Sequence, residues 1–259
     1  MSASSKRLAK LLDRIRGRAI ATLSFPADFL RFRRLASQHE AWRRPRWRDM
    51  HACLADRTSL TTFDRHYVYH PAWALRVLLE TKPVEHVDIS SILGFSAMAS
   101  AIVPVRFFDF RPAPIVLPNL TCDRADLLAL PFADQSIASL SCMHVIEHIG
   151  LGRYGDPLDP SGDTKALSEL ERVLAPGGTL LVVVPVGRPR VCFNAHRIYD
   201  LDEIARRVPS LVLRSFALIP DAPTAGQYDS GLIEGADAEL VRQQRYGCGC
   251  FRFERPLHV

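Results

Sequence analysis

The sequence predicts an α/β protein: a doubly wound, mostly parallel sheet with a basic helical extension before it. From Val84 onward, short apolar segments alternate with segments of helical periodicity, as they do where helices cover both faces of a parallel sheet. Residues 179–185 (TLLVVVP) are apolar throughout, which is typical of a strand buried on both faces. We therefore expect residues 1–69 to form the extension and residues 70–259 the sheet domain.

The extension carries the positive charge of the protein. The formal net charge of the 259 residues is +5, yet residues 1–50 alone hold 13 Lys and Arg against 4 Asp and Glu. Apolar residues from Leu8 to Leu23 follow helical spacing with basic residues opposite, which predicts an amphipathic helix. Such a helix can pack on its own domain, lie on an anionic membrane surface, or serve as a mitochondrial targeting segment, although Asp13 argues against the last.

The elements after this helix follow from local patterns. Residues 39–51 predict an irregular basic connection, and residues 70–82 a helix that leads into the sheet domain. Strands are expected at residues 85–90, 105–110, 137–142, 179–185, 211–219 and 246–255, and helices at residues 95–103 and 164–175. The sequence Pro176-Gly177-Gly178 ends the second of these helices. The link before the next strand near Leu120 has only about ten residues, so we expect it to be extended, because a parallel crossover usually needs about a dozen.

The cysteines and the hydropathy bound the compartment. Six cysteines are scattered along the chain and no signal peptide is recognised, which favours a reducing compartment without a disulfide framework. Cys248 and Cys250 would share one face of a strand, but no matching His or Cys pair has ligand spacing, so no metal site is expected. No apolar run reaches the roughly 18–20 residues of a membrane span. We expect a cytoplasmic protein whose basic helix can contact the inner face of the membrane.

Acidic residues end three successive strands of the predicted sheet. Asp88 ends the first strand, Asp109 ends the second, and Asp126 follows the third. Ligands of open parallel sheets bind outside the carboxyl ends of the strands, where a carboxylate can accept hydrogen bonds from ribose hydroxyls or an adenine amino group. The alternative is that each acid caps the helix that follows.

Two longer segments resemble class I S-adenosylmethionine-dependent methyltransferases. Residues 125–149 (ADLLALPFADQSIASLSCMHVIEHI) and 167–185 (LSELERVLAPGGTLLVVVP) carry the similarity, which is collinear over about residues 84–200. The resemblance implies a Rossmann-like seven-stranded sheet with a reversed final strand, and S-adenosylmethionine as cofactor. It implies that Asp109 binds the ribose and Asp126 the adenine end. The full set of cofactor-binding residues expected from it is Asp88, Ser90, Gly94, Asp109, Asp126, Leu127 and His144.

The first loop departs from that family. Its members usually carry D-x-G-x-G-x-G after the first strand, whereas residues 88–95 (DISSILGF) place Ser90 and Ile92 where the first two glycines belong. These glycines allow a tight turn and a close approach to the cofactor, and a β-branched residue resists positive φ. Weak cofactor binding, an altered pose and no binding therefore all stay open.

Two polar loops follow the fourth and fifth strands and predict the acceptor site. Residues 143–163 (MHVIEHIGLGRYGDPLDPSGD) with 184–200 (VPVGRPRVCFNAHRIYD) resemble an uncharacterised bacterial subfamily associated with cell-surface polysaccharide biosynthesis. The expected substrate-binding residues are Arg153, Tyr154, Asp156, Arg188, Asn194 and Arg197. The expected base that removes a proton from the acceptor is His196 or His148, with Glu147 to orient or replace it. Alternatively, these residues hold the two loops to each other.

Two functions follow from these expectations. The first is S-adenosylmethionine-dependent O-methylation of a sugar or polysaccharide precursor, which the polar loops favour. The second is a non-catalytic binding or scaffold module with a degenerate methyltransferase fold, which the altered first loop favours. A nucleic-acid methyltransferase is disfavoured because the main domain is mildly acidic and lacks a base-reading motif such as N-P-P-Y. The oligomeric state stays open.

Overall fold

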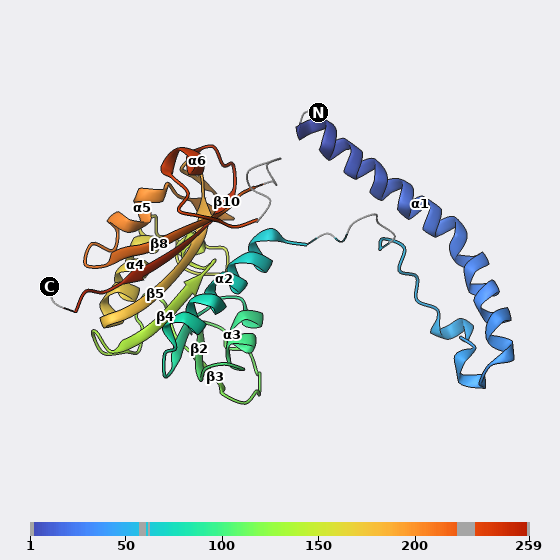
Figure 1. Ribbon diagram of the computed structural model, residues 1–259, viewed down its shortest axis with the longest axis horizontal. Coiled ribbons are helices and arrows are strands. Elements are labelled where there is room, and N and C mark those ends of the chain that lie inside the picture. Colours follow the sequence, from blue (N-terminus) through green and yellow to red (C-terminus); the bar gives the residue numbers. More distant parts are fainter. Residues whose placement is uncertain (1–2, 57–60, 62, 222–230, 258–259) are drawn as a thin grey trace. The chain divides into compact units, whose positions relative to one another are not determined.

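The computed structural model describes residues 3–56, 61, 63–221 and 231–257, with the backbone alone for residues 3–14 and 16–18. The chain divides into two compact units, residues 1–63 and residues 64–259. Figure 1 shows a long helix in the first unit and a sheet flanked by helices in the second. Each unit is described by itself.

The first unit is a long helix with a folded connection at its end. Helix α1 (Ala3–Leu35) extends the predicted helix in both directions and contains Pro26. The connection holds three 3₁₀ helices where the sequence predicted an irregular segment: η1 (Ala36–Gln38), η2 (Ala41–Arg43) and η3 (Trp47–Asp49). It folds back on α1, because the Phe29 and Trp47 rings lie 4.7 Å apart and the Arg33 guanidinium lies within 6 Å of both. None of the described helices combines the length and the apolar character needed to cross a membrane.

The second unit begins with helix α2 (Arg65–Thr81), five residues before the predicted start. The carboxylate of Asp64 caps it by accepting a hydrogen bond from the Tyr67 backbone N–H at 3.3 Å. The helix ends at Lys82, which adopts left-handed φ and donates its N–H to the Leu78 carbonyl at 2.8 Å. The early start has a consequence for the site, because it places His66 and Tyr67 on this helix.

The sheet is mixed and has eight strands in the order β3-β2-β1-β4-β5-β10-β8-β9. The strands are β1 (His86–Ile89), β2 (Val105–Asp109), β3 (Leu120–Arg124), β4 (Ile137–Met143), β5 (Leu174–Val186), β8 (Val212–Ile219), β9 (Ile233–Glu234) and β10 (Gly247–Glu254). Strands β1 to β5 pair with one another in parallel, whereas β10 runs antiparallel to both β5 and β8. The expected seven-stranded count was wrong, because the two-residue strand β9 is too short to leave a pattern in the sequence.

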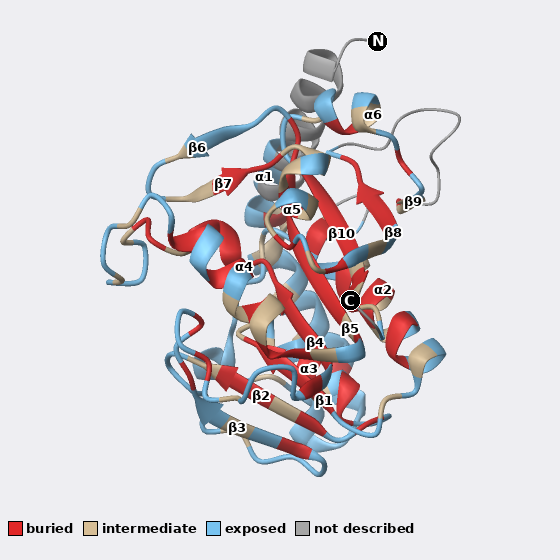
Figure 2. Ribbon diagram, turned by 90° about the vertical axis from the view of Figure 1, so that its left-hand side faces the viewer, coloured by how far each residue is buried: buried red, intermediate tan, exposed pale blue. Residues whose placement is uncertain are grey.

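Helices cover both faces of this sheet (Figure 1). Helices α2 and α3 (Leu93–Ala99) pack on one face, and α4 (Gly162–Val173), α5 (Leu201–Arg206) and α6 (Ala238–Arg242) on the other. Alternate residues of β5 serve the two faces: Val183 joins the α2 side and Val182 the α4 side. The central strands β4 and β5 are buried along most of their length, whereas β3 is largely exposed (Figure 2).

Helix α4 shows how the sequence specifies this packing. Its buried residues Ala166, Leu167, Leu170 and Val173 recur at helical spacing on one face. Burial of each leucine contributes roughly 1.5–3 kcal/mol. The helix ends at Val173, and β5 follows at once with an irregularity in its register before Thr179. Residues 110–119 contain no helix, as expected for the short link between β2 and β3.

Candidate active site

The first loop obtains its tight turn without glycine. Ser90, directly after β1, adopts φ of 55° and donates its backbone N–H to the Phe108 carbonyl at 2.7 Å. Left-handed backbone costs roughly 1–2 kcal/mol for a residue with a Cβ. Ile92 has a negative φ of −58° and precedes α3, so the β-branched residue does not carry the strain. Neither Ile92 nor Gly94 lines the two cavities described below.

Asp88 is fully buried beneath this loop and lines neither cavity. Its carboxylate accepts hydrogen bonds from the hydroxyls of Ser91 and Ser96, each at 2.5 Å, and of Ser141. Burial raises the pKa of Asp88 to about 6, although the three serine hydrogen bonds oppose the shift. Asp88 therefore acts on the loop: Ser91 also accepts the backbone N–H of Met143 at 3.0 Å, which ties the loop to β4.

A buried histidine completes the network under the loop. His86 Nδ1 lies 2.8 Å from the Ser139 hydroxyl and Nε2 lies 2.9 Å from the Ser141 hydroxyl. Burial lowers the pKa of His86 to about 3, so the ring is neutral. Because Ser141 gives its proton to Asp88, it accepts the Nε2–H of His86, and Nδ1 accepts the proton of Ser139. The hydroxyls of Ser139 and Ser141 therefore each donate their proton to one defined acceptor.

A first cavity of about 280 Å³ lies at the carboxyl ends of β1, β2 and β3. We call it the Asp109 cavity; Asp109 and Asp126 both line it, with Ser90, Leu127 and His144. Asp109 Oδ1 accepts the Arg111 N–H at 2.7 Å, and Asp126 Oδ1 accepts the Leu128 N–H at 2.9 Å. The second oxygen of each carboxylate has no hydrogen-bond partner among the residues that the structure describes.

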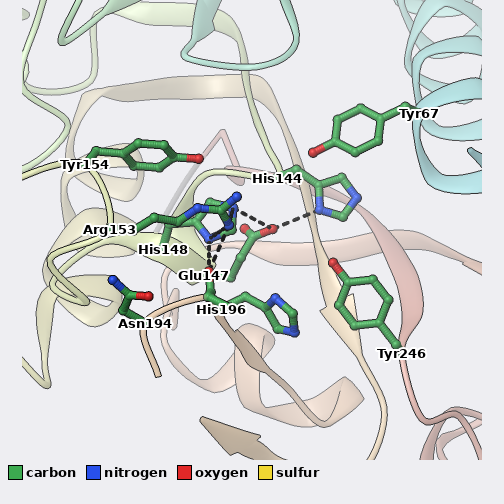
Figure 3. A pocket seen from close by; sticks show the side chains of 10 residues that line it. Tyr67, His144, Glu147, His148, Arg153, Tyr154, Asn194, His196 and Tyr246 are labelled. Carbon is green, nitrogen blue, oxygen red and sulfur yellow. Dashed lines mark hydrogen bonds and ion pairs between the residues drawn. The ribbon is translucent and has the colours of Figure 1, made fainter. Parts of the chain in front are cut away.

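A second cavity of about 540 Å³ adjoins the first (Figure 3). We call it the Glu147 cavity; it is lined by Tyr67, His144, Glu147, His148, Arg153, Tyr154, Asn194, Ala195, His196 and Tyr246. His144, His148 and Tyr154 line both cavities. The two cavities therefore share one wall, which the loop after β4 supplies.

Glu147 is the buried negative charge of the second cavity. Its Oε1 accepts a hydrogen bond from His144 Nδ1 at 2.8 Å, and its Oε2 is buried with no partner among the described atoms. Burial acts to raise the pKa of Glu147, but the hydrogen bond and electrostatic interaction with His144, with a smaller effect of His148, bring it below its usual value. Glu147 is consequently ionised at neutral pH.

His148 is engaged at its ring nitrogens. Nδ1 lies 2.6 Å from the Ala195 carbonyl, and an Arg153 guanidinium nitrogen lies 3.2 Å from Nδ1 and 3.4 Å from Nε2. The same Arg153 nitrogen donates to the Ala195 carbonyl at 3.0 Å. Burial lowers the pKa of His148. This arrangement ties the loop after β4 to the hairpin of β6 (Arg190–Cys192) and β7 (His196–Ile198).

His196 is the less constrained imidazole. It begins β7, lines the Glu147 cavity and packs against Tyr246 with ring centroids 4.7 Å apart. No hydrogen bond of its ring is found within the described part of the chain. Burial lowers the pKa of His196, so the ring is neutral at pH 7 and has a lone pair available to accept a proton.

The expected substrate-binding residues divide into two groups. Arg153, Tyr154 and Asn194 line the Glu147 cavity. Asp156, Arg188 and Arg197 do not. Asp156 lines the Asp109 cavity, but its carboxylate is occupied by the backbone N–H groups of Gly150 (2.7 Å), Tyr154 (3.2 Å) and Gly152.

Arg197 joins the two loops. It is buried, donates to the Ile149 carbonyl at 2.6 Å, and lies 3.7 Å from the Asp163 carboxylate. Arg188 contributes its backbone, with a long hydrogen bond to the Gln244 carbonyl. For Arg197 the alternative reading, that polar residues hold the loops to each other, describes the observed contacts.

Sequence reasoning missed two tyrosines of the second cavity. Tyr67 comes from α2 and Tyr246 from the turn before β10, far from the loops that carry the other residues. Neither lies in a motif, and only the three-dimensional fold brings them to the cavity. Their rings contact imidazoles of the site: Tyr67 lies 5.3 Å from His144, and Tyr246 lies 5.0 Å from His66.

Of the comparisons with known proteins, the one with solved structures identifies the fold. A family model described as a Caenorhabditis protein of unknown function, DUF268, matches residues 133–214, which is less than half of the chain. The search of curated proteins found no match. Among solved structures, a proposed sarcosine dimethylglycine methyltransferase from Galdieria sulphuraria is similar, with 13% sequence identity and a TM-score of 0.50. The match covers 73% of this chain and 85% of that one.

Two further structures lie slightly below that score. One is a chain from the complex between the Haloferax volcanii Trm112 methyltransferase activator and a proposed methyltransferase (20% identity, 76% of this chain, 92% of that chain, TM-score 0.49). The other is the N-methyltransferase NodS from Bradyrhizobium japonicum WM9 in complex with S-adenosyl-L-homocysteine (16% identity, 72% and 85%, TM-score 0.48). The chain therefore has a Rossmann-like α/β methyltransferase fold.

Proposed function

We propose that this chain is an S-adenosylmethionine-dependent methyltransferase that methylates an oxygen atom of a sugar or of a cell-surface polysaccharide precursor. One observation carries the proposal: the Asp109 cavity and the Glu147 cavity share the wall formed by His144, His148 and Tyr154. A cofactor in the first and an acceptor in the second would be neighbours, as a two-substrate transfer requires.

The residues of the Asp109 cavity fit an adenosine group. Asp109 and Asp126 each keep one carboxylate oxygen that can accept a hydrogen bond from a ribose hydroxyl or an adenine amino group. Leu127 and Val145 supply apolar contact for the flat base. The volume of about 280 Å³ lies just below the range for ligand pockets, roughly 300–1,000 Å³, and suits the nucleoside part of the cofactor. When bound, S-adenosylmethionine supplies an electrophilic methyl group.

The residues of the Glu147 cavity fit a polar acceptor. Arg153 and Asn194 offer hydrogen-bond donors to hydroxyl or anionic groups. His196 is the residue we assign to removal of the acceptor proton, because it is neutral at pH 7 and its ring is not engaged as that of His148 is. Ionised Glu147 would stabilise the imidazolium that forms.

The alternative function is a binding or scaffold module without catalysis. Ser90 and Ile92 in place of the first two glycines favour it, because Ser90 lines the Asp109 cavity with a residue that carries a Cβ where the family usually has glycine. Under this alternative, the Glu147 cavity would bind a glycan or a partner group without methylating it.

Calorimetric titration separates the two functions. Purified full-length protein is titrated with S-adenosyl-L-homocysteine and with S-adenosylmethionine, and its melting temperature is measured with each. The methyltransferase proposal expects saturable binding of one molecule per chain and a higher melting temperature. Absence of both heat and protection would transfer the assignment to the binding module.

The basic extension supports a second part of the proposal, contact with a membrane surface. Residues 1–50 carry 13 basic against 4 acidic side chains, and α1 is long enough to lie along a bilayer surface. We propose that the protein works at the inner face of the membrane, where polysaccharide precursors on lipid carriers would be accessible. The mildly acidic main domain argues against a nucleic acid as the acceptor.

A further inference from the structure

Three buried side chains, one of which also lines the Glu147 cavity, gather metal-ligating atoms. His66 comes from α2, His144 follows β4, and Cys248 lies in β10. One ligand atom from each lies within 4.8 Å of the other two. Imidazole nitrogen and thiolate sulfur are the ligands that zinc prefers in proteins. The three residues are distant in the chain, so no ligand spacing could be recognised in the sequence.

The separation of two of these atoms already suits a tetrahedral ion. His144 Nε2 lies 3.5 Å from Cys248 Sγ. Zinc bonds of about 2.0–2.1 Å to nitrogen and about 2.3 Å to sulfur place two tetrahedral ligands about 3.6 Å apart. The ligand atom of His66 lies within 4.8 Å of the other two, so a small adjustment of the side chains would complete a three-ligand site.

Glu147 prepares His144 for this role. Its carboxylate accepts the Nδ1–H of His144 at 2.8 Å, which leaves the Nε2 lone pair on the side of Cys248. Histidine ligands of metals usually donate their second N–H to such a carboxylate, which fixes the tautomer and makes the ligand more basic. A divalent ion, one thiolate and the Glu147 carboxylate together carry no net charge, which favours their joint burial.

His70 is an independent sign of an incomplete polar cluster. It follows His66 by four residues on α2, so both imidazoles lie on one face of the helix. Its Nδ1 donates to the His66 carbonyl at 2.7 Å, whereas its fully buried Nε2 has no partner among the described atoms. The ring packs edge-on against His144 with centroids 5.1 Å apart. A thiol hydrogen bond from Cys248 to His144 would explain the distance between those two residues, but it would not explain why the Nε2 of His70 is buried without a partner in the described part of the chain.

We propose that His66, His144 and Cys248 bind a divalent zinc-class cation, with Glu147 holding His144 and with His70 beside the site. The proposal does not depend on the methyltransferase activity, since its ligands and its test concern the metal alone. His144 also lines both cavities, so the ion would be bound by a residue of their shared wall.

Cobalt(II) is the probe for this site. The full-length protein is stripped of metal with a chelator, kept reduced, and titrated with Co²⁺ and then with Zn²⁺. We expect one Co²⁺ per chain, the intense visible bands of tetrahedral coordination, a thiolate-to-cobalt charge-transfer band, and loss of all these bands on displacement by Zn²⁺. Binding below one ion per chain, or a spectrum without the thiolate band, would overturn the proposal and leave a thiol–imidazole hydrogen bond as the explanation.

Matched variants identify the ligands. Cys248→Ser should abolish the charge-transfer band, whereas Cys250→Ser, at a buried position two residues along the same strand, should retain it. Glu147→Gln should keep the band but weaken the affinity by about 10- to 100-fold. A band that survives in Cys248→Ser contradicts the assignment. If Cys248→Ser does not fold, as judged by circular dichroism, the wild-type spectrum and the Glu147→Gln titration still decide the question.

Discussion

Substitution of Ser141 by alanine tests the buried network beneath the first loop. The hydroxyl accepts the Nε2–H of His86 at 2.9 Å and donates to Asp88. Its removal leaves the buried imidazole N–H without an acceptor, which costs about 1–3 kcal/mol, and removes one of three hydrogen bonds to a carboxylate, worth about 1.5–3 kcal/mol. We expect Ser141→Ala to lower the free energy of unfolding by about 3–5 kcal/mol at pH 7.5.

The pH dependence makes this prediction specific. The pKa of Asp88 is raised from 3.8 to about 6 in the folded protein, so between these values the folded state holds a proton that the unfolded state has lost. The contribution of Asp88 to stability is therefore present at low pH and is lost as the pH rises through about 6. Removal of the Ser141 hydrogen bond raises the pKa of Asp88 further. At pH values above this pKa, a further rise of the pKa by one unit lowers the free energy of unfolding by about 1.4 kcal/mol. The substitution should thus be more destabilising at pH 7.5 than at pH 5.

Urea unfolding at both pH values measures the effect, with Ser139→Ala as the matched control. Ser139 lies on the same strand and contacts His86, but it does not contact the Asp88 carboxylate. Its substitution should cost about 1–3 kcal/mol with little difference between the two pH values. If Ser141→Ala costs no more at pH 7.5 than at pH 5, or no more than Ser139→Ala, the assigned proton directions in the network are wrong.

Four further predictions concern the proposed function. His196→Ala should lower the methyl-transfer rate by about 10²- to 10⁴-fold in assays with labelled S-adenosylmethionine and a panel of nucleotide sugars, with cofactor affinity unchanged. The rate of the wild-type protein should fall as the pH falls below 6.5, through the lowered pKa of His196, and an unchanged rate in the variant would exclude His196 as the base. Asp109→Asn should weaken the binding of S-adenosyl-L-homocysteine by about 10- to 100-fold, measured by calorimetry, since a hydrogen bond to a charged group contributes about 1.5–3 kcal/mol. The substitution Asp134→Asn, at an exposed position, should leave this affinity unchanged. Ser90→Gly relieves the strain of the left-handed backbone but removes the 3.2 Å hydrogen bond to the Phe108 carbonyl, so the free energy of unfolding should change by less than about 1 kcal/mol. The affinity for S-adenosyl-L-homocysteine should not fall; a fall of more than tenfold would show that the serine hydroxyl binds the cofactor. Deletion of residues 1–63 should abolish sedimentation with vesicles that contain anionic lipid, and 0.5 M salt should have the same effect on the intact chain; binding that persists in the deletion would place the contact elsewhere.

Most of the sheet could be predicted because its signals are local. The unbroken apolar run at residues 179–185 predicted the buried strand β5, and the segments at residues 95–103 and 105–110 predicted α3 and β2. The start of α2 was placed too late, because the apolar pattern becomes clear only after Pro71, whereas the cap at Asp64 lies in a polar stretch. Strand β9 has two residues and pairs only with β8, so no periodicity announces it.

The candidate site could be predicted only where one loop carries several of its residues. Glu147, His148, Arg153 and Tyr154 lie within one segment, and all of them line the Glu147 cavity. Arg197 was assigned to the substrate from its place in a polar loop, but its depth of burial and its bonds to carbonyl groups could not be inferred from spacing. Contacts of this kind depend on how two loops meet, which a single sequence does not encode locally.

His144 connects the separate features of the site. It adopts φ of 58° directly after β4, a strained conformation for a residue with a Cβ. In that position it lines both cavities, hydrogen-bonds the buried Glu147 and approaches Cys248. Glycine would relieve the strain but would remove the only hydrogen bond that a described residue makes to the Glu147 carboxylate, and leave His148 Nε2, 3.8 Å from Oε1, as its nearest charge partner, which costs more than the strained backbone. The strain at this position therefore has a physical compensation: the imidazole keeps a buried carboxylate ionised at the point where the two proposed ligands would meet.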